Sequence, residues 1–238
     1  MEEDSLLKPY RVIDLTDEKG LLCGKILGDL GADVIKVEPP GGDDARKIGP
    51  FLGGTPHPER SLFWWAFNTS KRGITLDILT EEGKEQLKRL VETSDFVVES
   101  FPPGYLDGLG LGYSVLREVN PAVIMVSITP FGSSGPYRDF RGSDLVLTAM
   151  GEQLFISGDA DRPPVRISVP QAYLHGSAHA AIGALAALWR RARTGQGQHV
   201  DVSIQASMVQ LPGATLLDWF YDKKLISRKG ASVSRYGH

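Results

Sequence analysis

The sequence predicts an α/β protein with an open, mostly parallel sheet and helices on both faces. Two observations favour this class. Short apolar runs with β-branched residues alternate with helical segments, and each of the first helical segments separates two such runs. This alternation is typical of parallel strands whose connecting helices cover both sides of the sheet. With 238 residues, the chain has room for one large domain, or for one domain and a fragment of a second.

The first strand–helix–strand unit is predicted between residues 10 and 37. Residues 10–15 form a short β-branched run that suits a buried strand, and the apolar residues of 21–30 recur at helical spacing. Gly31 stands where this helix should end, ahead of a second strand at 33–37. Two strands joined by one helix pair naturally in parallel.

The same alternation continues along the chain. The further predicted elements are strands at 73–77, 95–99, 122–128 and 199–203, and helices at 80–93, 109–119 and 174–193. Thr80 and the two glutamates after it suit a helix N-terminus. The last helix carries many small side chains, which let another backbone approach closely. Residues 39–58 and 129–141 are long Pro- and Gly-rich segments, which are more often functional than idle in a compact domain, with disordered connectors as the alternative.

Composition excludes several classes of function. The 26 Lys and Arg nearly balance the 29 Asp and Glu, for a net charge of −3, and no long basic block exists. Nucleic-acid and anionic-membrane partners are therefore not expected. Cys23 is the only cysteine, so we expect neither a disulfide framework nor a Cys-based metal site. The acidic N-terminus and the absence of a spanning apolar run predict a soluble, cytoplasmic protein.

The common cofactor and metal motifs do not fit. No G-x-G-x-x-G opens a helix after the first strand, and no Walker motif is present. His175 and His179 have metal-ligand spacing, but Gly176 stands where an H-E-x-x-H motif needs glutamate. We therefore expect no metal. No G-x-S-x-G elbow supports Ser/His/Asp catalysis.

Two segments beside predicted strands point to a ligand site. Lys71 and Arg72 precede the strand at 73–77, and Phe101 follows the strand at 95–99. Ligands of open α/β sheets bind at the carboxyl ends of strands. Cations near an exposed aromatic ring would suit an anionic ligand with a stackable ring. The alternative is that Lys71 and Arg72 are solvated loop charges.

Several motifs, in order along the chain, resemble the class III CoA-transferase family, also called CaiB/BaiF. They lie at residues 14–16, 30–43, 68–77, 99–104, 120–121, 127–132, 135–137, 183–188 and 194–202. The match covers about residues 10–210. It implies a Rossmann-like large domain followed by a small domain, with two chains interlaced as a homodimer or as a heteromer with a related subunit. Residues 1–212 would form the CoA-binding large domain, and 213–238 a linker or the beginning of a truncated small domain.

The resemblance also implies a set of coenzyme A contacts. Matched residue by residue, they are Thr16, Lys36, Asn68, Lys71, Arg72, Ser100 and Phe101. The cations would hold the CoA phosphates, and the aromatic ring would lie near the adenine. We expect Lys71, Arg72 and Phe101 to surround one cleft. Two departures from the family pattern are residues 17–20, which replace an apolar run ending in Gly-Pro, and Gly108, which replaces an arginine.

The catalytic position departs as well. The family's transferases use an aspartate shortly before the small-residue helix, and the match places Tyr173 there, with Gln171 and His175 as further candidates. A phenol is mostly protonated at neutral pH and cannot form an acyl anhydride, although it can donate a proton. The racemase branch needs His before Asp, and this chain has Ser143-Asp144.

Three functions follow from the resemblance. The first is an enzyme that transfers CoA between carboxylic acids, with acyl-CoA as substrate and Tyr173, Gln171 or His175 assisting. The second is an acyl-CoA lyase, isomerase or racemase on the same scaffold, in which Tyr173 or His175 moves a proton. The third is a non-catalytic CoA-binding subunit that works with a complete partner.

Overall fold

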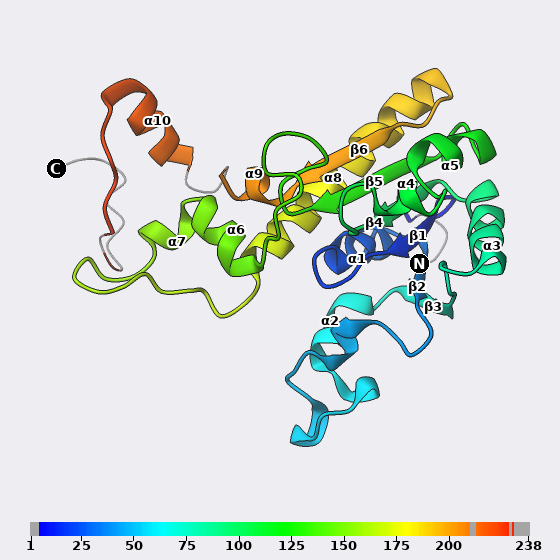
Figure 1. The fold of residues 1–238 in the computed structure, drawn as a ribbon, viewed down its shortest axis with the longest axis horizontal. Coiled ribbons are helices and arrows are strands. Elements are labelled where there is room, and N and C mark those ends of the chain that lie inside the picture. The colour runs from blue at the N-terminus through cyan, green and yellow to red at the C-terminus, as the bar shows by residue number, and fades with distance from the viewer. Residues whose placement is uncertain (1–4, 210–212, 229, 231–238) are drawn as a thin grey trace.

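The computed structural model describes residues 5–209, 213–228 and 230 and contains one six-stranded sheet (Figure 1). The strands are β1 (Arg11–Leu15), β2 (Asp33–Glu38), β3 (Lys71–Thr75), β4 (Phe96–Glu99), β5 (Ile124–Thr129) and β6 (His199–Ser203). Their order is β3-β2-β1-β4-β5-β6, and every neighbouring pair is parallel. The order reverses between β1 and β4, which creates a crevice at the carboxyl ends of the central strands.

Helices cover both faces of this sheet, as the sequence predicts. They are α1 (Leu21–Asp29), α2 (Leu62–Asn68), α3 (Glu81–Glu92), α4 (Tyr105–Gly108), α5 (Tyr113–Val119), α6 (Asp144–Met150), α7 (Gln153–Ile156), α8 (Gln171–Thr194), α9 (Ile204–Val209) and α10 (Gly213–Asp222). Apolar residues of α1, α8 and α9 form one core with one face of the strands. Those of α3, α4 and α5 form a second core on the opposite face. The predicted α/β class is confirmed.

Strand β3 begins two residues earlier than predicted. Lys71 and Arg72 therefore lie at its amino end, inside the strand, and pair with Val34 and Ile35 of β2. The apolar pattern was misleading because β3 is an edge strand that is largely exposed. Edge strands accept charged side chains, and backbone hydrogen bonds to the neighbouring strand fix their bounds.

The single helix predicted at 109–119 is wrong at its N-terminal end. A short helix, α4, comes first, and the second helix, α5, begins only at Tyr113. Between them, Gly110 has φ of 73°, a left-handed conformation that ends a helix and that glycine adopts without strain. The structure thus shortens the predicted helix to residues 113–119 and adds a separate short helix, α4, before it.

Helix α8 begins at Gln171, three residues before the predicted start, and ends at Thr194. Its buried residues are all small, and a Cβ atom on Gly176 would lie 2.7 Å from Ile204. The small side chains thus allow close packing against α9, as predicted. The large side chains of Ile182 and Trp189 are instead exposed, at 63% and 65%.

The long segment after β2 is ordered. It contains three short 3₁₀ helices, at Asp44–Lys47, Leu52–Gly54 and Pro58–Arg60, and leads into α2, which projects from the sheet region in Figure 1. This finding disfavours the disordered alternative for residues 39–58.

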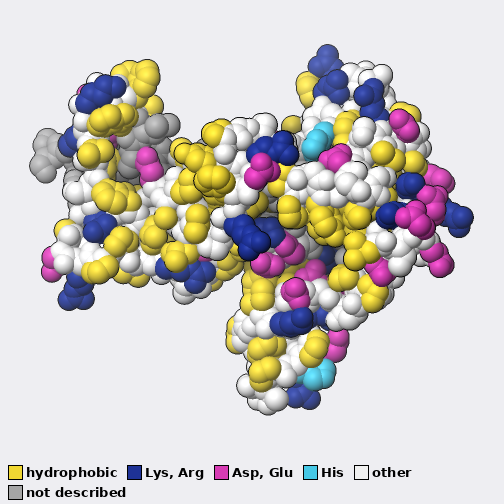
Figure 2. Space-filling view, in the orientation of Figure 1, with side chains coloured by type: hydrophobic (Ala, Val, Ile, Leu, Met, Phe, Trp, Pro, Cys, Tyr) yellow, Lys and Arg dark blue, Asp and Glu magenta, His cyan; other side chains and the backbone are white. Residues whose placement is uncertain are grey.

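The C-terminal part of the described chain lies beside α6 and α7, away from the sheet (Figure 1). Arg228 donates hydrogen bonds to the carbonyl oxygens of Phe155, Asp159 and Arg162. Figure 2 shows hydrophobic side chains over this region, where α10 exposes the aromatic rings of residues 219–221. The predicted boundary at 212/213 adjoins residues outside the described ranges and stays a prediction.

No helix in the described chain is long and apolar enough to cross a membrane.

Candidate ligand cavities at the carboxyl edge of the sheet

A cavity of about 550 Å³ lies at the carboxyl ends of β1, β2, β3 and β4. We name it the edge cavity; it is lined by residues 15–18, 37, 39–44, 47, 76–79, 101 and 105. Its size is in the range typical of small-molecule and cofactor sites. Apolar side chains make much of the wall, and Gly41 and Gly42, both with positive φ, make the turn that follows β2. The edge cavity therefore offers apolar surface and exposed backbone to a ligand.

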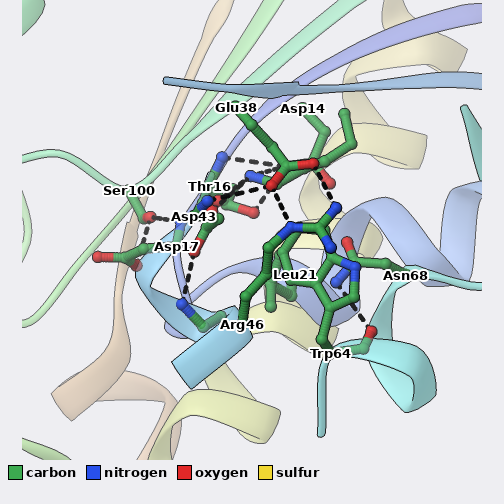
Figure 3. Close-up of polar contacts among 12 residues, drawn as sticks. Asp14, Thr16, Asp17, Leu21, Glu38, Asp43, Arg46, Trp64, Asn68 and Ser100 are labelled. Carbon is green, nitrogen blue, oxygen red and sulfur yellow. Dashed lines mark hydrogen bonds and ion pairs between the residues drawn. The ribbon is translucent and has the colours of Figure 1, made fainter. Parts of the chain in front are cut away.

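The loop over the edge cavity is held by an ion pair (Figure 3). Arg46 donates through Nη2 to Oε1 of Glu38 at 2.8 Å and lies over the ring of Trp64, 4.1 Å from its centroid. Asp43 caps the 3₁₀ helix by accepting from the amide of Ala45 at 2.8 Å. These contacts fix the loop between β2 and α2 in place.

A buried cluster of charges adjoins the edge cavity through Asp43, and Figure 3 shows Asp14 and Asp43 among its contacts. The carboxylate of Asp14 is fully buried and accepts from Nζ of Lys71 at 2.8 Å. Nζ of Lys36 lies 3.9 Å from Asp14 and 3.1 Å from Asp43. A Cβ atom on Gly24 would lie 2.2 Å from Oδ2 of Asp14, so only glycine lets α1 pass this close.

The charges of this cluster compensate one another. Burial alone would raise the pKa of Asp14, but the ammonium groups of Lys71 and Lys36 outweigh it and hold that pKa below its ordinary value. Burial lowers the pKa of Lys71, although Asp14 acts in the opposite direction. The cluster stabilises the end of β1 and the start of the loop that follows it.

A second cavity, of about 530 Å³, lies beside the edge cavity and contains Tyr173. We name it the Tyr173 cavity; it is lined by residues 18–19, 100–103, 130, 138–143 and 173. Burial, and next the negative charge of Glu18, raises the pKa of Tyr173 to about 12. The phenol is therefore protonated at neutral pH and can donate a hydrogen bond into the cavity.

The structure places three predicted coenzyme A contacts at these cavities. Thr16 lines the edge cavity, with its hydroxyl donating to Asp14 at 2.6 Å. Ser100 lines the Tyr173 cavity and donates to Asp17 at 2.7 Å. Phe101 lines both cavities and stacks on Tyr105, with ring centroids 4.9 Å apart.

The other four predicted contacts line neither cavity. Lys36 and Lys71 belong to the buried cluster, and Asn68 accepts from Lys71 at 3.0 Å. Arg72 pairs with Asp33 at 2.7 Å, at the amino end of the sheet. The expectation that Lys71, Arg72 and Phe101 surround one cleft is wrong, because the side chain of Lys71 is buried against Asp14 and that of Arg72 pairs with Asp33 at the amino end of β2.

The three catalytic candidates do not converge either. Because α8 begins at Gln171, successive candidates are two residues apart on a helix, and side chains at that spacing do not face each other. Tyr173 lines the cavity that carries its name, whereas Gln171 and His175 line neither cavity. Burial, and next His179, lowers the pKa of His175. Across the described residues, no three His, Cys, Asp or Glu side chains converge as metal ligands.

Sequence reasoning missed several charged residues at the cavities, and two of them, Lys47 and Glu18, matter for the proposals below. Lys47 is the one lysine or arginine that lines the edge cavity within the described chain. Glu18 lines both cavities. The signal for Glu18 was present, since residues 17–20 depart from the resembled family pattern just after the first strand.

The sheet order and the position of the edge cavity define a doubly wound α/β protein with a ligand crevice outside the carboxyl ends of its strands. The sequence profile of CoA-transferase family III matches residues 7–237. The chain belongs to this family, which confirms the resemblance found in the sequence.

Curated relatives extend the comparison. The chain is 40% identical over 222 residues to the succinyl-CoA:(R)-benzylsuccinate CoA-transferase subunit BbsE of Thauera aromatica, covering 93% of this chain and 54% of that protein. It is 44% identical over 193 residues to the succinyl-CoA–D-citramalate CoA-transferase of Chloroflexus aurantiacus, covering 81% and 47%. The chain thus spans about half the length of these relatives.

A solved structure shares the fold. The crystal structure of a CaiB/BaiF family protein from Brucella suis superposes with a TM-score of 0.90 at 37% identity, covering 98% of this chain and 63% of that chain. The six-stranded sheet and its helices therefore correspond to the fold of a family member.

Proposed function

We propose that this chain forms part of an enzyme that transfers CoA from an acyl-CoA to a free carboxylic acid. The observation that carries the proposal is the pair of adjoining cavities at the carboxyl edge of the sheet, in a chain that belongs to CoA-transferase family III. CoA is long and has a polar nucleotide at one end and a thioester at the other. The edge cavity would take the nucleotide and pantetheine, and the Tyr173 cavity would take the acyl end.

The lining of the edge cavity fits this assignment. Apolar side chains such as Leu76, Ile78 and Phe101 offer surface for the adenine and the pantetheine arm. The exposed ammonium group of Lys47 is available for a phosphate, although it pairs with Asp44 at 2.6 Å. The backbone amide of Gly41 adds an uncharged donor at the cavity wall, whereas the amide of Gly42 already donates to the carbonyl oxygen of Pro39 at 2.9 Å.

Substituting Lys47 tests the placement of the nucleotide. We expect Lys47→Ala to weaken CoA binding roughly fivefold, because one exposed contact from an ammonium group to a phosphate is lost. Isothermal titration of CoA into the full-length protein measures the change. Lys88→Ala removes a lysine that forms the same (i, i+3) kind of ion pair on α3, with Glu85, and should leave the affinity unchanged. Equal affinity for CoA in both variants would show that Lys47 does not contact the nucleotide.

Tyr173 would act on the acyl end as a hydrogen-bond donor. Its high pKa keeps the proton on the phenol, and the backbone amide of Asp144 points to the phenolic oxygen. A protonated phenol in a partly buried site can stabilise negative charge that develops on a reacting carbonyl oxygen. It is not required to lose its proton in this role.

We expect Tyr173→Phe to keep the affinity for CoA and to slow CoA transfer about 100-fold, which is typical for the loss of one such donor. Succinyl-CoA is the first donor to test, because the two curated relatives described above are named for it. Mass spectrometry of the CoA products formed with free dicarboxylic acids gives the rate. A variant that transfers CoA at the wild-type rate would exclude Tyr173 from the mechanism.

A second candidate function is that of a subunit that requires a related partner chain. Tyr173 stands where the resemblance implies aspartate, and one relative is itself named as a subunit. The exposed aromatic side chains of α10 and the exposed Ile182 and Trp189 of α8 provide apolar surface for another chain. No transfer by the full-length protein alone, but transfer after a related chain is added, would favour this function. Loss or isomerisation of acyl-CoA without transfer would favour a lyase or isomerase.

A further inference from the structure

Glu18 lies where the edge cavity meets the Tyr173 cavity. It follows β1, and only Glu18 and Phe101, among the described residues, line both cavities. The ring of Phe101 carries no acid–base or nucleophilic group. Among the described residues, Glu18 is thus the one ionisable group at the junction between the proposed CoA site and the proposed acyl site.

The Glu18 carboxylate is also the least engaged of the acids around these cavities. The others pair within the protein: Asp17 with Ser100 and Lys19, Asp43 with Lys36, Asp44 with Lys47, Asp77 with the amide of Leu79, and Asp139 with Arg138. Glu18 interacts with its own backbone amide and forms no ion pair within the described chain. Its carboxylate is therefore available to a ligand.

The loop that carries Glu18 is anchored on both sides of that residue. The amide of Asp17 donates to Oγ of Ser100 at 2.9 Å. The carbonyl oxygen of Lys19 accepts from Oγ of Ser177, on α8, at 2.9 Å. Fixed neighbours reduce the positions that the Glu18 side chain can adopt, which favours a reaction that needs close approach.

The surroundings make this carboxylate more basic than usual. Burial, and next the charge of Asp17, raises the pKa of Glu18. Glu18 in turn contributes to the raised pKa of Tyr173, so the two groups interact electrostatically. A carboxylate without an ion-pair partner, held in the same cavity as a protonated phenol, combines a nucleophile with a hydrogen-bond donor.

We propose that Glu18 is the carboxylate that carries CoA during transfer. This inference rests on the transferase function proposed above and names a group in this chain able to form the acyl anhydride that Tyr173 cannot form. Covalent catalysis by a glutamate divides one difficult exchange into steps that each proceed at a carbonyl carbon.

The steps balance without any other reactant. An oxygen of Glu18 attacks the thioester carbonyl carbon, the C–S bond breaks, and CoA leaves as thiolate, which gives a mixed anhydride between Glu18 and the donor acyl group. The thiolate attacks the Glu18 carbonyl carbon, which releases the donor carboxylate and forms a glutamyl-CoA thioester. The acceptor carboxylate attacks that thioester and forms a second anhydride. The thiolate then attacks the acceptor's carbonyl carbon, which yields the new acyl-CoA and restores the Glu18 carboxylate.

The experiment compares the full-length wild-type protein with Glu18→Gln. We expect the variant to keep its affinity for CoA and to lose CoA transfer at least about 1000-fold, as removal of a nucleophile does. Hydroxylamine added during turnover of succinyl-CoA should convert wild-type Glu18 to a hydroxamate, which mass spectrometry locates within the tryptic peptide of residues 12–19. The control is Glu85→Gln, the same change at an exposed position of α3.

Each outcome decides one question. Transfer by the wild-type protein together with a hydroxamate on Glu18 and an inactive Glu18→Gln supports the inference. If the wild-type protein transfers CoA and Glu18→Gln is equally active, the inference is overturned and the transferase function stands. The same holds if the hydroxamate forms on another residue. A wild-type protein that binds CoA but transfers none overturns the transferase function and, with it, the role of Glu18.

Discussion

Replacing Asp14 with asparagine is expected to destabilise the fold by about 3–5 kcal/mol, the cost typical of breaking a buried ion pair by removing one partner. Asp14 is fully buried, with Lys71 at 2.8 Å and Lys36 at 3.9 Å. The neutral amide would leave two buried ammonium groups with reduced compensation. The hydrogen bond from the amide of Thr16 to Oδ1 can persist, so the loss reports mainly on charge.

Urea unfolding followed by circular dichroism measures this loss at pH 7. The matched control is Glu85→Gln, which removes one charge of an exposed pair with Lys88 and should change stability by less than about 0.5 kcal/mol. A loss below about 1 kcal/mol for Asp14→Asn would contradict the picture of a tightly compensated cluster.

The same cluster explains why the sequence led to the wrong cation set for the ligand site. Lys71 looks like a loop lysine beside Arg72, but its side chain is only 1% exposed because it neutralises Asp14. Neither its burial nor its partner is visible in the local pattern, since Asp14 lies 57 residues away. Long-range ion pairing of this kind depends on the packed sheet.

The order of strands and helices was predictable because buried strands and helices with an apolar face leave strong periodic patterns. The predictions were least accurate where other forces fix the structure. The exposed edge strand β3 is defined by pairing with β2, and the break between α4 and α5 depends on the left-handed conformation at Gly110. Helix α2, rich in aromatic residues, packs partly through Trp64 and was not predicted.

At the candidate site, the resemblance named Tyr173 and Phe101, which line the cavities, but gave no reason to single out Glu18. Whether a carboxylate is engaged depends on its neighbours in space. Asp17, one residue earlier, is held by Ser100 from the end of β4, whereas Glu18 is not. Two adjacent acids with similar chemistry thus have different availability, which a sequence alone does not reveal.

Stability above pH 7 is expected to increase when Glu99 is replaced with glutamine. Burial raises the pKa of Glu99 from 4.5 to about 7. The hydrogen bonds from Ser127 and from the amide of Phe101 act in the opposite direction, but burial outweighs them. Its carboxyl is only 6% exposed and forms no ion pair within the described chain. Because the folded state binds the proton more tightly, stability from this group is present below pH 4.5 and is lost as pH rises through about 7.

The neutral amide does not ionise, so the free energy of unfolding of Glu99→Gln should exceed that of the wild type by at most about 3 kcal/mol at pH 8 and match it near pH 4. Urea unfolding at the two pH values gives the comparison, and Glu118→Gln, at an exposed position of α5, should show no such dependence. If the free energies of unfolding of Glu99→Gln and the wild type differ by the same amount at both pH values, Glu99 does not titrate in this range.

The neighbours of Glu99 give the physical reason for its preference for the neutral form. Oγ of Ser127 lies 2.8 Å from Nε2 of His199, and burial lowers the pKa of that histidine. A neutral imidazole supplies no positive charge to compensate an ionised Glu99. A protonated Glu99 can instead donate to Ser127, whose hydroxyl then donates to His199. Glutamine keeps this donor through its amide, so the stabilisation expected at pH 8 comes from removing a buried charge while the hydrogen-bonded chain remains.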